Sequence, residues 1–169
     1  MIDRWANREQ LRADGRRILR WIKRQGVVMY YDSIEQERAK EFLLPVFRVL
    51  EDTIRDVPLC AVYLYRQADQ PSTLRTTSGI LMQDVDGLVW LDVTSDRGNL
   101  HAIGLSVEAL NRGEEYFQML FIHELCHALY GFPAHGREFH KKLDALIKRC
   151  NDATCVHIAN DYIEFAENA

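Results

Sequence analysis

Several kinds of segment are missing from this sequence. No apolar run approaches the roughly 20 residues that a membrane-spanning helix requires. The first residues, MIDRWANREQLRADGRR, lack the apolar core of a secretory signal peptide. Internal repeats and low-complexity segments are also absent. We therefore expect a protein that does not enter a membrane and that acts in the cytoplasm.

Cysteine pairs of the kind that build zinc ribbons are missing as well. The four cysteines are Cys60, Cys126, Cys150 and Cys155, and no two of them form a CxxC pair. Four residues separate Cys150 from Cys155, which is the wrong spacing for such a ribbon. In a cytoplasmic protein we expect thiols at these positions, and a Cys150–Cys155 disulfide only in an oxidising compartment.

The composition is that of an ordinary globular domain. Of 169 residues, 47% are hydrophobic and 27% are charged, which argues against a disordered chain. The net charge of −4 argues against general nucleic-acid binding. Residues 1–26 hold eight Lys and Arg against three Asp and Glu, a net +5, and the remainder holds 13 against 22, a net −9. The basic segment either contacts phosphates or acidic partners, or forms a solvated helix face, which we favour.

Hydrophobic periodicity predicts helices in the first part of the chain. Residues 3–25 have apolar side chains at helical spacing, and Gly26 provides a stop. A capping box at 33–36 predicts that Ser33 opens a second helix. This helix is expected to kink or restart at Pro45 and to end before Pro58.

Short strands are predicted in the middle of the chain. The segments 59–67, 80–85 and 88–93 are rich in β-branched and aromatic residues, and an Asp-Gly turn at 86–87 predicts a hairpin between the last two. Residues 101–105 are expected to add a short fourth strand.

Helices follow again in the last part of the chain. Ser106 is expected to cap a short turn, and residues 114–130 to form a buried helix that is apolar on all sides. A last helix is expected over about 137–150, and the tail from Thr154 fits a strand or a helix equally well. The order of helices, a small sheet and helices predicts an α+β fold.

The buried helix contains an HExxH motif, because residues 123–127 read HELCH. His123 and His127 lie four residues apart on one helix face, so both imidazoles can bind one Zn²⁺ at about 2.0–2.1 Å. Glu124 is then close enough to act as general base on a zinc-activated water without coordinating the metal. Without a metal, these polar groups are costly in an apolar helix; the alternative is a core helix with hydrogen-bonded histidines.

A catalytic zinc ion needs a third protein ligand and an open fourth position. His135 is the best candidate, because the Gly-Phe-Pro stop at 131–133 lets the chain turn back toward the metal. Other residues with ligand chemistry are His101, Glu138, His140 and His157. Of these, His140 is the main rival, Glu138 is a carboxylate option, and the other two are expected to be structural.

The segment HELCHALYGFPAHGREF resembles the SprT-like (Spartan-type) family of zinc metallopeptidases. That family pairs an HExxH helix with a downstream His-Gly-x-x-Phe, which residues 135–139 match. The order of a helix, a small sheet and the active-site helix over about residues 40–150 is also similar to the family.

The resemblance implies a minimal zincin-like fold and one catalytic Zn²⁺ bound by His123, His127 and His135, with Glu124 as the catalytic carboxylate. It also implies hydrolysis of peptide bonds in protein substrates, often proteins attached to DNA. Residues 1–32 then form a basic N-terminal helical extension, and residues 33–169 form the metallopeptidase domain.

Two other hypotheses remain open from the sequence. In one, the zinc is structural and the chain is a binding module without peptidase activity, in which the basic helix holds a partner or nucleic acid. In the other, the chain is an ImmA/IrrE-like protease that cleaves a regulator and takes a different downstream ligand after its HExxH motif.

Overall fold

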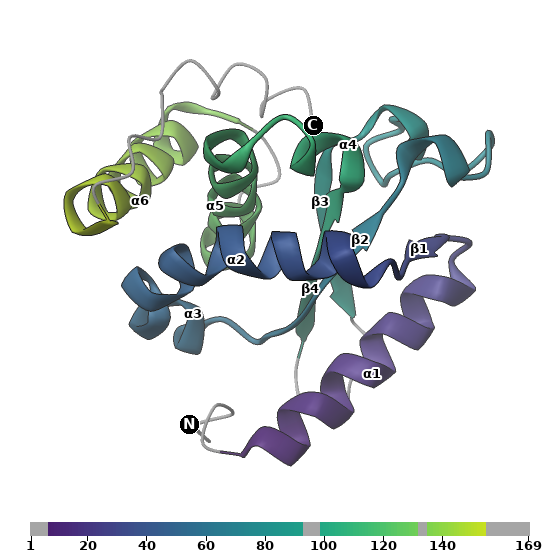
Figure 1. Ribbon diagram of the computed structural model, residues 1–169, viewed down its shortest axis with the longest axis horizontal. Helices are drawn as coiled ribbons and strands as arrows, with labels where there is room; N and C mark the ends of the chain where they lie inside the picture. The colour runs from purple at the N-terminus through teal and green to yellow at the C-terminus, as the bar shows by residue number, and fades with distance from the viewer. Residues whose placement is uncertain (1–6, 93–98, 132–134, 155–169) are drawn as a thin grey trace.

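The computed structural model describes residues 7–92, 99–131 and 135–154 of the chain (Figure 1). Within them, helices pack on both faces of a four-stranded sheet, which confirms the predicted α+β fold. The helices are α1 (Arg8–Arg24), α2 (Ser33–Val49), α3 (Glu51–Asp56), α4 (Val107–Leu110), α5 (Glu114–Tyr130) and α6 (Arg137–Thr154). The strands are β1 (Met29–Tyr30), β2 (Leu59–Tyr65), β3 (Gly87–Asp92) and β4 (Leu100–Ser106). No helix in these ranges is long and apolar enough to cross a bilayer.

The sheet has the strand order β1-β2-β4-β3. β2 and β4 run parallel, with Val62 opposite Ile103 and Leu64 opposite Leu105, and the two outer pairs are antiparallel. The segment 101–105, expected as a short fourth strand, therefore lies in a central strand. Among the described residues β3 pairs only with β4, so its other side forms an open edge of the sheet.

The hairpin predicted at the Asp-Gly turn of residues 86–87 is wrong. Residues 80–85 do not form its first strand, because Met82–Asp84 fold as a 3-10 turn. Met82 and Val85 are both buried and lie three residues apart. A 3-10 turn places such positions on one side, whereas a strand would place them on opposite faces. β3 pairs instead with β4, which follows it in the chain.

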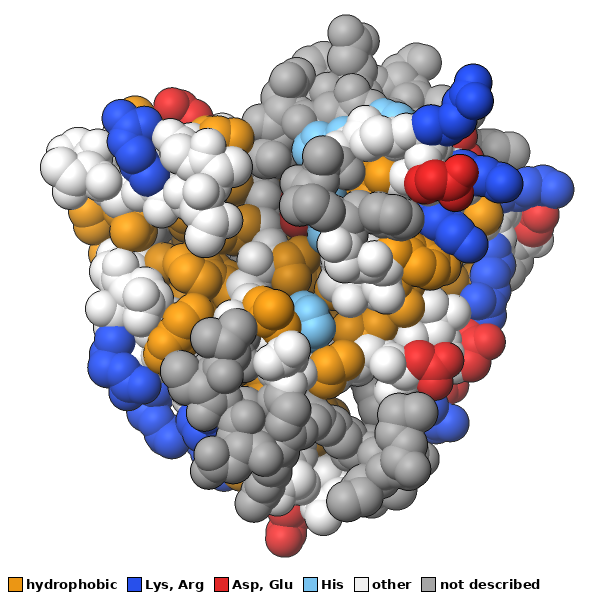
Figure 2. Space-filling view, turned by 180° about the vertical axis from the view of Figure 1, so that it is seen from behind, with side chains coloured by type: hydrophobic (Ala, Val, Ile, Leu, Met, Phe, Trp, Pro, Cys, Tyr) orange, Lys and Arg blue, Asp and Glu red, His pale blue; other side chains and the backbone are white. Residues whose placement is uncertain are grey.

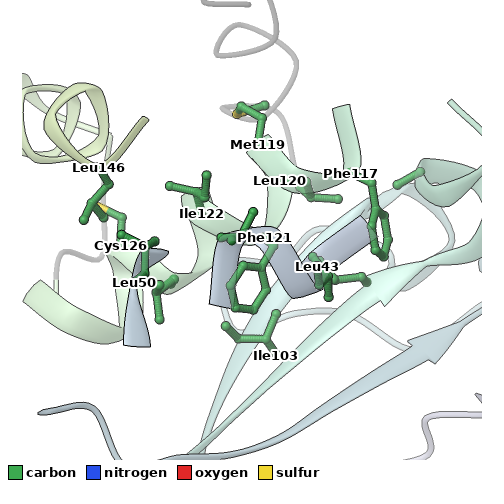
Figure 3. Packing of buried hydrophobic residues seen from close by; sticks show 14 of the residues in the cluster. Leu43, Leu50, Ile103, Phe117, Met119, Leu120, Phe121, Ile122, Cys126 and Leu146 are labelled. Atoms are coloured by element: carbon green, nitrogen blue, oxygen red, sulfur yellow. The ribbon is translucent and has the colours of Figure 1, made fainter. Parts of the chain in front are cut away.

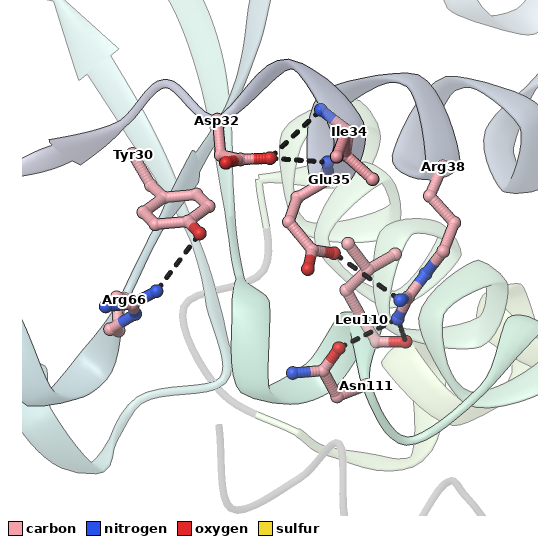
Figure 4. A network of polar contacts seen from close by, with 8 residues as sticks. All are labelled: Tyr30, Asp32, Ile34, Glu35, Arg38, Arg66, Leu110 and Asn111. Carbon is pink, nitrogen blue, oxygen red and sulfur yellow. Dashed lines mark hydrogen bonds and ion pairs between the residues drawn. The ribbon is translucent and has the colours of Figure 1, made fainter.

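The start of α2 differs from the predicted capping box. Asp32 caps the helix rather than Ser33, and its Oδ1 accepts hydrogen bonds from the backbone N–H groups of Ile34 (3.0 Å) and Glu35 (3.2 Å) (Figure 4). A carboxylate at this position satisfies two helix donors and also interacts favourably with the positive end of the helix dipole.

The helix expected to run on until Pro58 is divided into two. α2 continues through Pro45 and ends at Val49, and α3 follows after the fully buried Leu50. Arg38 joins α2 to the end of α4 by donating a hydrogen bond to the carbonyl of Leu110 (3.1 Å; Figure 4).

The larger hydrophobic core is built around α5, which has the bounds expected from the sequence. This helix lies between α2, α6 and one face of the sheet (Figures 1 and 3). The buried side chains of α5 in this core include Phe117, Leu120, Phe121, Ile122 and Cys126. They share the core with buried residues from the rest of the fold, among them Leu43, Leu50, Ile103 and Leu146. A helix with apolar side chains on every side is buried in this way because no side of it gains from contact with water.

The other face of the sheet is covered by α1. Ile18 and Ile22 are fully buried against this face, in a cluster with Tyr63 and Leu100. The outward side of α1 is exposed and carries the arginines. A phosphate-binding face would be exposed as well, so the solvated face favoured from the sequence stays a prediction. The division of the chain after residue 32 into an extension and a domain stays a prediction.

The contact between α1 and β2 depends on the absence of a side chain at Gly15. A Cβ atom placed there would lie 2.7 Å from the backbone oxygen of Cys60. Replacing glycine by alanine in a helix interior normally stabilises the protein by about 0.5–1 kcal/mol. Whether alanine at position 15 stabilises or destabilises the protein therefore tests this contact.

We expect Gly15→Ala to lower the free energy of unfolding by about 1–3 kcal/mol, because the helix has to move away from the strand. Urea unfolding followed by circular dichroism measures this change. The exposed neighbour Arg16 provides the control, since Arg16→Ala should change stability by less than about 0.5 kcal/mol. A stabilised Gly15→Ala variant would contradict the close packing.

Candidate metal centre

The end of α5 directs the chain back toward its own helix. Gly131 adopts a left-handed conformation (φ 64°), and its N–H donates to the carbonyl of His127 (2.9 Å). A left-handed residue ends a helix and turns the chain, and glycine adopts it without steric cost. α6 then begins at Arg137, and His135 lies just before it.

Three imidazoles meet at this turn. Each of His123, His127 and His135 offers one ring nitrogen, and these nitrogens all lie within 4.8 Å of one another. The Nε2 atoms of His127 and His135 are 3.0 Å apart. Two nitrogens bound to one tetrahedral zinc at about 2.0–2.1 Å would be about 3.3 Å apart, so this spacing fits a shared ion. The structure thus brings together the three ligands proposed from the sequence.

Phe139 of α6 packs against all three imidazoles. Its ring centroid lies 5.0 Å from that of His123, 4.4 Å from that of His127 and 5.0 Å from that of His135, and it is stacked on His127. Phe139 is almost completely buried. Its ring therefore restricts the orientation of the three imidazoles without competing as a ligand. The sequence places Phe139 only on the apolar face of a helix and does not indicate this role.

His123 has a buried imidazole with nothing to bind. Its side chain has an exposed fraction of 0%, and neither ring nitrogen has a hydrogen-bond partner among the described residues. Burial, with smaller contributions from the other histidines, lowers the pKa of His123 to about 2. The ring is thus neutral, which is the form that binds metals, and a metal ion would satisfy a nitrogen that is otherwise desolvated at a cost of about 1–3 kcal/mol.

Glu124 lies beside this group and is also buried, with an exposed fraction of 4%. Burial alone raises its pKa to about 8. The carboxyl group is therefore mostly protonated at neutral pH in the metal-free protein. A divalent cation held by the neighbouring histidines would favour the carboxylate and lower this pKa.

The metal centre opens into a cleft of about 630 Å³. Glu124, His127 and His135 line one part of it, and β3 and the segment 74–80 line most of the rest, with Gln25 and Val85. Figure 2 shows histidine side chains that reach the surface next to hydrophobic ones, with Lys and Arg toward the margins of the view. A small molecule or an extended segment can thus reach the imidazoles and the carboxyl group from solvent.

The remaining ligand candidates do not join the three histidines. Among the described residues, the group that can hold a metal includes neither His101 of β4 nor His140 or Glu138 of α6. Glu138 is exposed. His157 and Cys155 lie outside the described residues. The redox state of the Cys150–Cys155 pair therefore stays a prediction.

The segment that forms the far side of the cleft was missed by the sequence analysis. Residues 67–78 are polar and predict a loop, and residues 80–85 are expected to form a strand. The signal was present in the Ser-Gly pair at 78–79, which is a turn signal between the apolar residues Leu74 and Ile80.

Comparisons with protein-family models, with curated proteins and with solved structures find no match for this chain. The resemblance to the SprT-like family therefore stays a prediction. What supports a metal centre is that two imidazoles of α5 and the imidazole of His135, which lies before α6, come within reach of one ion, with the buried carboxyl group of Glu124 next to His123 in the chain.

We expect the purified protein to bind about one Zn²⁺ per chain and His135→Ala to lose most of that affinity. Removing a direct ligand should weaken binding by more than the roughly 10–100-fold that loss of an outer partner costs. Competition with a chromogenic chelator measures the affinity. His140→Ala is the matched control and should bind zinc like the wild type. The reverse result, with binding lost only in His140→Ala, would favour an ImmA/IrrE-like ligand set.

Proposed function

We propose that this protein is a cytoplasmic zinc-dependent metallopeptidase that hydrolyses peptide bonds in protein substrates. The observation that carries the proposal is the buried His123, whose two ring nitrogens have no hydrogen-bond partner among the described residues. Its ring centroid lies 4.9 Å from those of His127 and His135, and these two histidines line an open cleft together with the buried carboxyl group of Glu124. A structural zinc site would be closed and would need no such carboxyl group.

The residues divide the chemical work between them. His123, His127 and His135 would hold the metal, which when bound supplies Lewis-acid polarisation of a carbonyl and lowers the pKa of water. Glu124 accepts the proton of the attacking water and later delivers it to the leaving amine. Its burial keeps this proton inside the site, and its position in the cleft lining puts it within reach of a bound peptide.

An extended peptide is the ligand that best suits the edge strand in the cleft wall. β3 forms part of the cleft wall, and its outer edge has no neighbouring strand among the described residues. The backbone of an extended segment can pair with such an edge, independently of its side chains. This pairing would hold a peptide bond beside Glu124 and the histidines.

We expect Glu124→Gln to retain its zinc and to lose peptidase activity by about 10²–10⁴-fold, since glutamine cannot accept a proton. Release of fragments from casein, measured on protein of known zinc content, tests this. Glu138→Gln, which changes an exposed carboxylate of α6, should cleave casein at the wild-type rate. Equal turnover by metal-loaded Glu124→Gln and wild type would exclude the proposed role.

A second candidate function follows from the exposed face of α1. Five exposed arginines recur at every fourth residue, so that each is a neighbour of the next in a stripe that winds around the helix: Arg8, Arg12, Arg16, Arg20 and Arg24. A row of guanidinium groups of this kind can bind the phosphates of a nucleic acid, as expected for a binding module or for substrates held on DNA.

If α1 binds nucleic acid, the double variant Arg16→Glu/Arg20→Glu should bind duplex DNA at least tenfold more weakly and with a smaller salt dependence. Fluorescence anisotropy at several salt concentrations measures both quantities. Arg55→Glu, at an exposed arginine of α3, serves as the control. DNA binding that is equal in all three proteins would leave the stripe as a solvated face.

A further inference from the structure

The segment opposite the metal centre is a small hairpin rather than a loose loop. The N–H of Met82 donates to the carbonyl of Leu74 (2.9 Å), and the N–H of Thr76 donates to the carbonyl of Ile80 (2.8 Å). At the tip, Gly79 has a φ of 88° and donates to the carbonyl of Thr76 (2.9 Å). We call residues 74–82 the cleft hairpin.

The base of the cleft hairpin is anchored in the core on the α1 side of the sheet. Met82 is fully buried there, and Leu74 packs against the same cluster. Trp90 of β3 belongs to this cluster too and is fixed by a hydrogen bond from its Nε1 to the hydroxyl of Tyr63 (2.6 Å). This side of the cleft is therefore a preformed wall, which can discriminate between ligands without first having to be ordered.

The cleft hairpin and the metal centre lie on opposite sides of β3. α5, which carries Glu124 and His127, packs on one face of the sheet, and the cleft hairpin is anchored on the other. Successive side chains of an extended peptide point to opposite sides. A peptide bound along β3 would thus present every second side chain to the cleft hairpin and not to the metal ligands.

This wall combines apolar and hydroxyl side chains with a single charge. Leu74 and Ile80 are its apolar residues, the segment 76–78 supplies three hydroxyl groups, and Arg75 lines the cleft beside them. The guanidinium of Arg75 donates to the carbonyl of Gly79 (2.8 Å), which uses one of its five N–H donors and holds it on the cleft hairpin. Among the described residues that line the cleft, no other Lys or Arg is present, and the one carboxyl group is Glu124.

We propose that the cleft hairpin determines substrate specificity, and that Arg75 selects peptides with an acidic side chain at one of the positions that face it. This inference rests on the proposed peptidase function, which supplies the bound peptide. A basic side chain at that position would lie against a like charge, and the cleft lining offers it no carboxylate except that of Glu124. An acidic side chain would gain a charge-assisted hydrogen bond from donors that Gly79 leaves unused.

The test uses pairs of peptides derived from a cleavage site mapped in casein by mass spectrometry. Within each pair, one position on either side of the scissile bond carries Glu or Lys. For one position we expect wild-type kcat/KM to be about fivefold higher with Glu, the size typical of a partly exposed charge pair. Arg75→Glu should invert this preference, and Arg75→Gln should abolish it while leaving the charge-independent cleavage intact.

Binding separates this inference from the proposed function. Zinc-loaded Glu124→Gln, with and without Arg75→Glu, is titrated with the same labelled peptides and followed by fluorescence anisotropy. Tighter binding of the Glu peptide that Arg75→Glu inverts supports the inference, even if the wild type cleaves nothing and the peptidase proposal fails.

Arg16→Glu on α1 makes the same change of net charge outside the cleft and should leave the preference as in the wild type. Cleavage with no difference between Glu and Lys peptides at any position would overturn the inference and leave the peptidase function standing. A preference that Arg16→Glu alters as much as Arg75→Glu would also overturn it. So would a cleft that binds neither peptide.

Discussion

The structure depends on one constraint, which is that α5 has to be buried on all sides and yet carries polar groups in its last turns. His123 and Glu124 are almost inaccessible to water in the middle of the fold. Burying a polar group without a partner costs free energy, and burying a charge costs more. A metal ion of the kind we propose would resolve the conflict at His123 and, through its charge, also at Glu124. Binding of such an ion would therefore also stabilise the fold.

The rest of the fold places groups around that helix. Gly131 turns the chain so that His135 faces the two helix histidines, and Phe139 supports the three rings from α6. The 3-10 turn at Met82–Asp84 anchors the cleft hairpin, and β3 leaves an edge open beside it. Three segments from different parts of the chain therefore meet at one cleft, with the proposed metal ligands on one side of β3 and the cleft hairpin on the other.

The division of the cleft into two unlike sides explains how one small fold can separate reaction from recognition. If the proposed metal is bound, substitutions on the side formed by α5 would weaken its binding. The cleft hairpin contacts no imidazole in the proposed arrangement and is free to carry any charge. A single exposed arginine there can set substrate preference at little cost to stability, because exposed charges contribute little to folding.

Local patterns in the sequence were enough to place His123 and His127 on one face of a buried helix. Their spacing of four residues and the apolar surroundings of α5 predict both the helix and its burial, because helical periodicity depends only on neighbouring residues. Only the tertiary structure decided that His135 rather than His140 joins this pair, that Phe139 packs on all three rings, and that the Asp-Gly turn at 86–87 is not a hairpin. These outcomes depend on which distant segments pack together, here β3 with β4 and Met82 with the α1 side of the core. The spacing of residues along the chain does not determine such contacts.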